Sequence, residues 1–166
     1  MLTPEFWYTP APSLTANCLI PLSWIYRSLG HIQNKCIKTW KAPIPVICIG
    51  NLVAGGQGKT PAALSIGHIL KKQKRNIHYV SRGYRGKNKG PLLVKPENHE
   101  ALEVGDESLL LSRVAPTWIG SNRKSSIELA HKMGAEIIIM DDGFQNPSIH
   151  KDLSIIVVDG EMGFGN

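Results

Sequence analysis

The segment that most constrains the fold spans residues 50–60 and reads GNLVAGGQGKT. An apolar, β-branched run at 44–49 precedes it and predicts a buried strand. Pro61 follows it and is well tolerated in the first turn of a helix. A glycine-rich loop between a strand and a helix directs backbone N–H groups and the positive end of the helix dipole at phosphate oxygens. The sequence therefore predicts a nucleoside triphosphate site.

Within this loop, Lys59 is placed to reach the β- and γ-phosphates, and the Thr60 hydroxyl is placed to ligate Mg²⁺. The predicted nucleotide-binding residues are Val53, Ala54, Gly55, Gly56, Gln57, Gly58, Lys59 and Thr60. Val53 stands where the usual pattern G-x-x-x-x-G-K-S/T has its first glycine, and the pair Gly55 and Gly56 can supply the missing backbone freedom. The alternative is a glycine-rich turn that binds nothing. It is disfavoured because the predicted strand, the Gly-Lys-Thr motif and the predicted helix follow one another in the expected order.

From Pro43 onward, apolar runs alternate with helical patterns. Strands are expected at 44–50, 77–81, 117–120, 136–140 and 153–158, with a short extended segment at 91–95, and helices at 59–74, 105–114 and 123–133. Nearly continuous apolar strands that alternate with helices are typical of a parallel sheet covered on both faces. The expected fold class is therefore α/β and P-loop NTPase-like, with a mostly parallel sheet, over residues 43–166.

Residues 1–42 have a different character. The stretch 6–26 carries no charge but is interrupted by prolines, so it is a poor membrane-spanning helix, and no basic region of a signal peptide precedes it. Apolar and aromatic residues at 22–29, followed by lysines up to Lys41, suit an amphipathic helix that lies in a membrane interface. The alternative is a helix that packs on the surface of the protein's own domain.

The net charge of +6 is unevenly distributed, because no acidic residue lies between Glu5 and Glu97. Such a basic half favours an anionic partner: a nucleotide, an anionic membrane, a phosphorylated substrate or nucleic acid. A solvated basic face is the alternative, and no nucleic-acid recognition motif accompanies the charge. The cysteines Cys18, Cys36 and Cys48 show no pairing or metal spacing, which favours a reduced cytosolic setting with Cys48 in the core.

Carboxylates follow the apolar strand at 136–140. Strands of α/β sheets deliver such residues to the edge where ligands bind, so Asp141 can hold Mg²⁺ opposite Thr60, with Asp142 assisting. A second acidic pair, Asp106 and Glu107, opens the expected helix at 105–114. These two residues are either first-turn charges that favour the helix dipole, or a site with a general base for an attacking hydroxyl.

The loop SRGYRGK at 81–87 follows the second strand and is strongly basic. It can contact phosphates of an acceptor or of a nucleotide, or it can be a solvated basic loop, and the residues leave both open. Arg82 and Tyr84, together with Glu107, are the candidate substrate-binding residues. The histidines show no metal-ligand spacing and receive no role.

Several short motifs occur in a fixed order along the chain: PLSWIY at 21–26, APIPV at 42–46, the loop at 50–61, SRGY at 81–84, GDE at 105–107, DDGFQ at 141–145, VDG at 158–160 and GFGN at 163–166. In this order, over nearly the whole chain, they resemble the tetraacyldisaccharide 4'-kinases, the lipid A 4'-kinases of Gram-negative bacteria. The resemblance also accounts for Val53, because the family's loop lacks the first glycine.

The resemblance implies transfer of the γ-phosphoryl group of ATP, with Mg²⁺, to the 4'-hydroxyl of an anionic glycolipid, tetraacyldisaccharide 1-phosphate, to give lipid IVA. It implies a peripheral enzyme on the cytoplasmic face of the inner membrane, docked through residues 1–42, with the kinase lobe at 43–166. Asp106 would act as general base, while Lys59 and Mg²⁺ on Thr60 and Asp141 would neutralise charge. No nucleic acid and no obligate protein partner are implied.

The chain departs from the family at Asn146, where histidine is usual. Family members also continue beyond the GFGN motif into a second lobe, from which a histidine partners the aspartate base. We therefore expect this chain to correspond to the N-terminal part of the family, to bind nucleotide, and to phosphorylate poorly or not at all by itself.

Two other readings remain. A nucleotide-binding switch protein would use the same loop, although the chain has no Asn/Thr-Lys-x-Asp motif for guanine. The other is a catalytically inactive, membrane-associated fragment that still binds nucleotide.

Overall fold

The computed structural model describes Pro21, Trp24, residues 37–51, residues 58–158 and Gly160. The chain divides into two compact units, one of residues 1–38 and 158–166 and one of residues 39–157. In the first unit, Pro21 and Trp24 are helical and exposed. Most of the expected interface helix lies outside the described residues, so it stays a prediction, as does the boundary at residue 42. Within the described part, no helix is long and apolar enough to cross a bilayer.

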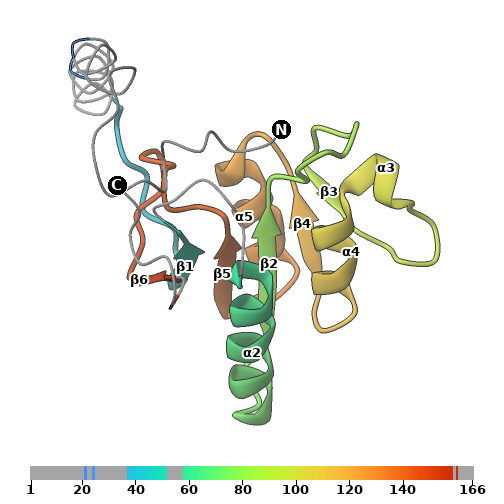
Figure 1. The fold of residues 1–166 in the computed structure, drawn as a ribbon. Helices are drawn as coiled ribbons and strands as arrows, with labels where there is room; N and C mark the ends of the chain where they lie inside the picture. Colours follow the sequence, from blue (N-terminus) through green and yellow to red (C-terminus); the bar gives the residue numbers. More distant parts are fainter. Residues whose placement is uncertain (1–20, 22–23, 25–36, 52–57, 159, 161–166) are drawn as a thin grey trace. The chain divides into compact units, whose positions relative to one another are not determined.

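The second unit is built on one six-stranded sheet, with the order β3-β4-β2-β5-β1-β6 (Figure 1). Its strands are β1 (Val46–Gly50), β2 (Ile77–Ser81), β3 (Leu92–Leu93), β4 (Thr117–Ile119), β5 (Ile137–Asp141) and β6 (Leu153–Ile156). All neighbouring pairs are parallel except β3 with β4, which are antiparallel. The carboxyl ends of β1, β2, β4 and β5 therefore meet at one edge of the sheet.

Helices cover both faces of this sheet (Figure 1). They are α2 (Lys59–Lys72), α3 (Ala101–Val104), α4 (Asp106–Ser112) and α5 (Arg123–Lys132). Successive strand residues point to opposite faces. On β5, Ile139 packs in the apolar cluster that includes residues of α2 and α4, whereas Ile138 and Met140 pack in the cluster that includes α5. The near-continuous apolar character of β5 follows from this double burial.

The expected α/β fold with a mostly parallel sheet is confirmed, and Cys48 is buried in the core as expected. Most expected elements occur within one or two residues of their predicted ends. The helix expected at 105–114 is present as α4, whereas the short helix α3 that precedes it was not predicted. The side chains and backbone of Glu100 and Glu103 form a capping box that begins α3, and Gly105, with φ of +86°, ends it.

Candidate active site

The junction between β1 and α2 has the geometry that a phosphate loop requires where it is described. Gly58 caps α2 in the left-handed region with φ of +94°, and Lys59 and Thr60 begin the helix. The first turn of α2 contains no acidic residue, so its positive dipole end is not neutralised locally. The remaining predicted loop residues, Val53, Ala54, Gly55, Gly56 and Gln57, lie outside the described residues, and their contacts stay predictions.

Lys59 meets the carboxylate of Asp142, a residue far away in the sequence. Its Nζ atom lies 2.7 Å from Asp142 Oδ1, and the Lys59 side chain is only 15% exposed. The backbone N–H of Asp142 donates to the carbonyl of Ile49, which ties the turn after β5 to the end of β1. Asp142 itself has φ of +54°, so the chain turns sharply there. The phosphate-loop lysine and a carboxylate predicted to assist the metal are thus brought together by neighbouring strands.

Asp141 is the last residue of β5 and is buried, with 1% of its surface exposed. The pKa of its carboxyl group is raised to about 6, mainly by burial and also by the charges of Glu107 and Asp142, while Lys59 acts in the opposite direction. Among the described residues, its Oδ1 atom has no hydrogen-bond donor. A buried carboxylate oxygen without a donor is a position at which a cation is favourable.

The donor set here fits Mg²⁺ that is shared with phosphates. Mg²⁺ is usually held by one or two carboxylates, a hydroxyl and substrate oxygens, and not by a complete cage of protein ligands. In the described ranges, no three His, Cys, Asp or Glu side chains are grouped as a metal site. Thr60 and Asp141 would therefore supply only part of a coordination sphere, as the sequence predicts.

The two acidic residues at the start of α4, Asp106 and Glu107, differ in how far they are buried. Glu107 is partly buried, and it is close enough to raise the pKa of Asp141 by charge repulsion. Asp106 is exposed in the first turn of α4. Gly105 precedes them, and a Cβ atom there would lie 2.5 Å from the carbonyl oxygen of Tyr84, so only glycine fits. Because Asp106 is exposed, its carboxylate is accessible to a ligand from solvent.

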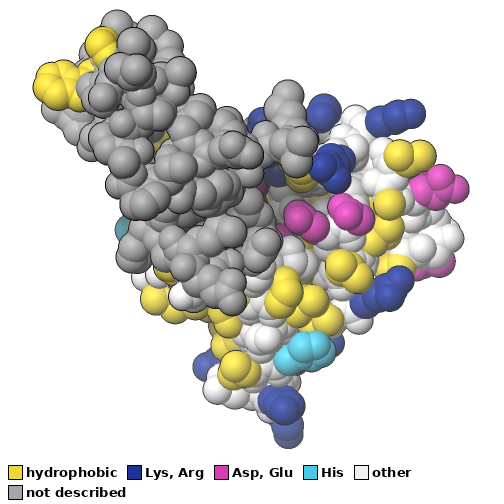
Figure 2. All heavy atoms as spheres, viewed as in Figure 1, with side chains coloured by type: hydrophobic (Ala, Val, Ile, Leu, Met, Phe, Trp, Pro, Cys, Tyr) yellow, Lys and Arg dark blue, Asp and Glu magenta, His cyan; other side chains and the backbone are white. Residues whose placement is uncertain are grey.

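The basic loop after β2 packs on α3. The backbone N–H groups of Lys87 and Asn88 donate to the carbonyls of Leu102 and Glu103. This attachment leaves Tyr84 60% exposed, with the Arg85 guanidinium 5.5 Å from the centre of its ring. In the space-filling view, acidic side chains lie near the middle of the face, with Lys and Arg side chains grouped above them (Figure 2). The face therefore carries charges of both signs.

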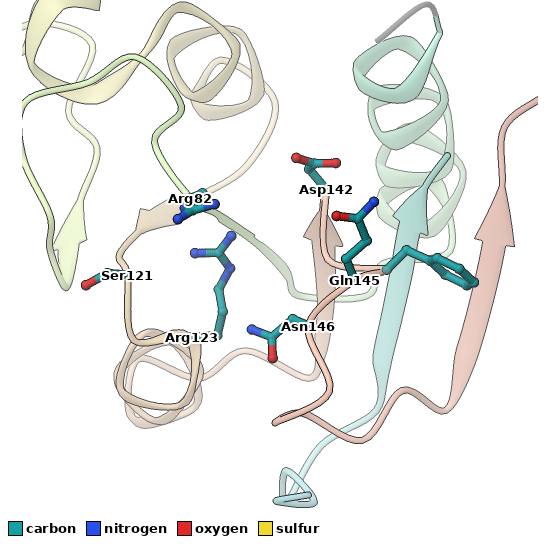
Figure 3. Close-up of a pocket in the computed structure, with 7 residues that line it drawn as sticks. Arg82, Ser121, Arg123, Asp142, Gln145 and Asn146 are labelled. Carbon is teal, nitrogen blue, oxygen red and sulfur yellow. The ribbon is translucent and has the colours of Figure 1, made fainter. Parts of the chain in front are cut away.

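A cavity of about 330 Å³ adjoins Asp142 (Figure 3). It is lined by Arg82, Ser121, Arg123, Asp142, Phe144, Gln145 and Asn146. The sequence pointed to Arg82 and Asp142 as binding residues, but it assigned nothing to Arg123. The available signal was the run Ser121-Asn122-Arg123, because it follows a predicted strand and begins a predicted helix at the ligand-binding edge of the sheet.

A phosphate-loop junction beside carboxylates at the end of the neighbouring parallel strand defines the class of P-loop nucleotide-binding α/β proteins. Within that class, the family model described as LpxK, tetraacyldisaccharide-1-P 4'-kinase, matches residues 15–166, so the chain belongs to this family.

Relatives and a solved structure agree with this membership. The chain is 46% identical to the tetraacyldisaccharide 4'-kinase of Parvibaculum lavamentivorans, of which it covers 49% while aligning over its own full length. It is also 46% identical to that of Rhodospirillum centenum, covering all of this chain and 50% of the relative. The crystal structure of LpxK from Aquifex aeolicus in complex with ATP has a TM-score of 0.76 and 31% identity, covering 90% of this chain and 53% of that one. The chain thus spans about half the length of the relatives that it matches.

Proposed function

We propose that this chain binds MgATP and carries the phosphoryl-transfer site of a tetraacyldisaccharide 4'-kinase. The reaction would move the γ-phosphoryl group of ATP to the 4'-hydroxyl of tetraacyldisaccharide 1-phosphate and give lipid IVA. The observation that carries the proposal is the meeting of Lys59 with Asp142, beside buried Asp141, at the ends of adjacent strands. Family membership supports it, and so does the related LpxK structure in complex with ATP.

In the nucleotide part of the site, residues 53–60 would surround the phosphates, and Lys59 would bind the β- and γ-phosphate oxygens. Asp142 holds the Lys59 ammonium group at 2.7 Å, so a phosphate would take over as its partner. Thr60 and Asp141 would hold Mg²⁺, with Asp142 nearby. When bound, this ion neutralises charge on the phosphate oxygens.

In the transfer step, the carboxylate of Asp106 would accept the proton of the 4'-hydroxyl group. The hydroxyl oxygen would form a bond to the γ-phosphorus while the bond from that phosphorus to the β–γ bridging oxygen breaks, and ADP would leave. Phosphoryl transfer depends mainly on positioning and charge stabilisation. Exposed Asp106, at the start of α4 and next to Glu107, is in a suitable place to meet an incoming acceptor. Arg82, Tyr84 and Glu107 would contact the acceptor.

The acceptor is an anionic glycolipid, so the reaction would take place at a membrane surface. Residues 1–42 would dock the protein peripherally to the cytoplasmic face of the inner membrane through aromatic residues and lysines. Neither a nucleic acid nor an obligate protein partner is part of the proposal. Because the chain spans about half the length of its relatives, a catalytically inactive, nucleotide-binding fragment at the membrane is the second candidate.

The direct test is Mg²⁺-dependent transfer of labelled γ-phosphate from ATP to tetraacyldisaccharide 1-phosphate, with MgATP binding measured in parallel. Lys59→Ala should abolish both binding and transfer, whereas Asp106→Ala should abolish transfer and leave binding intact. Lys72→Ala, at the exposed far end of α2, and Glu97→Ala, an exposed carboxylate, are matched controls. Binding without transfer in the unmodified chain would favour the inactive fragment, and absence of MgATP binding would refute the proposal.

A further inference from the structure

The turn that follows β5 carries Asp142 and spans residues 142–146; we call it the carboxylate turn (Figure 3). Two backbone hydrogen bonds hold it. The N–H of Asp142 donates to the carbonyl of Ile49 at 3.0 Å and ties the turn to β1. The N–H of Asn146 donates to the carbonyl of Gly143 at 3.0 Å and closes the turn. Neither bond engages the carbonyl group at the centre of the turn.

A side chain from outside the turn holds this central carbonyl. The Lys151 Nζ atom donates to the carbonyl of Phe144 at 2.7 Å, and it lies 5.7 Å from the centre of the Phe144 ring. Within the described ranges, Lys151 forms no ion pair with an Asp or Glu. The hydrogen bond is partly buried and has a charged donor, so it is stronger than the same contact between neutral groups in water. The ammonium group of Lys151 therefore binds the turn and not a carboxylate.

The backbone on both sides of Lys151 is fixed. The N–H of His150 donates to the carbonyl of Trp40 at 2.8 Å. On the other side, the N–H of Asp152 donates to the carbonyl of Val46 at 3.0 Å, and Asp152 Oδ2 accepts from the N–H of Val46 at 2.9 Å. Because its backbone is fixed to β1, Lys151 can hold the carboxylate turn at a defined distance from that strand.

The carboxylate turn also packs closely on the end of β1. A Cβ atom at Gly50 would lie 2.6 Å from the Cβ atom of Phe144. Burial raises the pKa of the Cys48 thiol and the charge of Lys151 lowers it, so the ammonium group lies near this buried residue of β1. A turn that packs this closely leaves little freedom for Asp142 while Lys151 holds its centre.

The position of the turn matters because Asp142 is not held by burial. Its side chain is 53% exposed, and it meets Lys59 at 2.7 Å, next to buried Asp141. A displaced turn would move the Asp142 carboxylate away from both neighbours. Mg²⁺ beside Asp141 would then lose an assisting carboxylate, whereas Lys59 would lose a counter-ion that competes with phosphate. The two consequences have opposite signs for nucleotide binding.

We propose that Lys151 is a positioning residue for the nucleotide site, which holds the carboxylate turn so that Asp142 meets Lys59 and supports Mg²⁺ beside Asp141. The inference rests on the proposed function, because that function supplies MgATP as the ligand. Lys151 acts through the carbonyl of Phe144 and does not contact the nucleotide.

The test on the nucleotide site measures the affinity of the chain for ATP with Mg²⁺ and with EDTA, by isothermal titration calorimetry. In Lys151→Met, MgATP affinity should fall about tenfold, because loss of a charge-assisted hydrogen bond frees the turn. Metal-free ATP affinity should stay the same or rise, because Lys59 is released from Asp142. A general structural defect would weaken both. Lys151→Arg keeps a charged donor and should restore MgATP affinity to within about threefold.

Amide hydrogen exchange, followed by NMR without nucleotide, tests the turn itself. In Lys151→Met, the amides of Asp142 and Asn146 should exchange about tenfold faster or more, because the turn opens more often. The amide of Ile138 in β5 should not change, because its hydrogen bond lies in the sheet and away from the turn. Lys132→Met, at an exposed lysine that ends α5, is the matched control and should change neither affinity nor exchange. Thermal unfolding checks that each variant is folded.

Three outcomes would overturn the inference. One is a folded Lys151→Met variant with normal MgATP affinity or normal exchange at Asp142. Another is equal weakening of MgATP and metal-free ATP, or no rescue by Lys151→Arg, which would show a role in folding alone. The third is a Lys151→Met variant that does not fold, because Lys151 would then hold the whole domain and not one turn. Failure of the proposed function is distinct: the unmodified chain would not bind MgATP, and the exchange measurement would still report on the turn.

Discussion

Two cationic positions border Asp142, and they differ in how their charge is satisfied. At the phosphate loop, Lys59 has an internal counter-ion 2.7 Å away. In the cavity, Arg123 is 5% exposed and has no carboxylate partner in the described ranges. A cation with a counter-ion costs little stability in the ligand-free protein. A buried cation without one lowers the free energy of unfolding. Lys59 could be found from a sequence motif, whereas the burial of Arg123 without an ion pair became visible only in the tertiary structure.

The largest expected effect concerns Lys59. Lys59→Ala removes the cation that the β- and γ-phosphates would contact, so MgATP affinity should fall about 100-fold or more. Isothermal titration calorimetry with MgATP measures the loss. The free energy of unfolding should change by less than about 1 kcal/mol, because the lost ion pair with Asp142 is partly exposed. Normal MgATP affinity in this variant would show that Lys59 does not bind the nucleotide phosphates.

Asp141 provides the next effect, and it depends on pH. Its pKa is raised to about 6 in the folded protein from 3.8, so folding favours the protonated form. The contribution of Asp141 to the free energy of unfolding is therefore most favourable below about pH 4. It falls by about 3 kcal/mol in total as the pH rises from about 4 to above about 6.

Asp141→Asn removes this titration. The variant should be about 3 kcal/mol more stable than the unmodified chain at pH 7.5 and nearly equal to it at pH 4, if other groups titrate alike. Urea unfolding at the two pH values measures the difference, with exposed Glu97→Gln as the control. A gain that is the same at both pH values would mean that the charge of Asp141 is not the cause.

Arg123 should give a smaller gain. Arg123→Met removes an unpaired buried charge but also the hydrogen bond to Gly120, so we expect the ligand-free chain to become about 1 kcal/mol more stable. Urea unfolding in phosphate-free buffer is the measurement. Strong destabilisation would show that Arg123 stabilises the start of α5. Its unpaired buried charge would then not be a net cost to the ligand-free protein.

The smallest effect belongs to an exposed charge on the same helix. Lys124 Nζ lies 3.8 Å from Glu128 Oε1, and both side chains are about half exposed. Lys124→Gln should change the free energy of unfolding by less than about 0.5 kcal/mol. An effect as large as that of Arg123→Met would show that charge anywhere on α5 matters, and burial would no longer explain the difference.

Much of the fold was predictable because its elements are locally consistent. Buried strands such as β5 are apolar at nearly every position, and α2 begins after a phosphate-loop signature. Helix α3 was missed, because its four residues are too few to show a helical period, and its capping box uses two glutamates without the usual Ser or Thr. The antiparallel pairing of β3 with β4 likewise has no local signature in the two residues of β3.

By itself, the sequence determined the alternation of strands and helices, the phosphate loop and the family, because these depend on periodicity and on motifs within short stretches. Only the tertiary structure decided which charges meet. Parallel pairing of β1 with β5 brings Lys59 to Asp142 across 83 positions of the chain, and the edge of the sheet brings Arg82 to Arg123. Burial then determines how much each charge costs in folding free energy, because a charge that water solvates well becomes unfavourable where neither solvent nor a counter-ion reaches it.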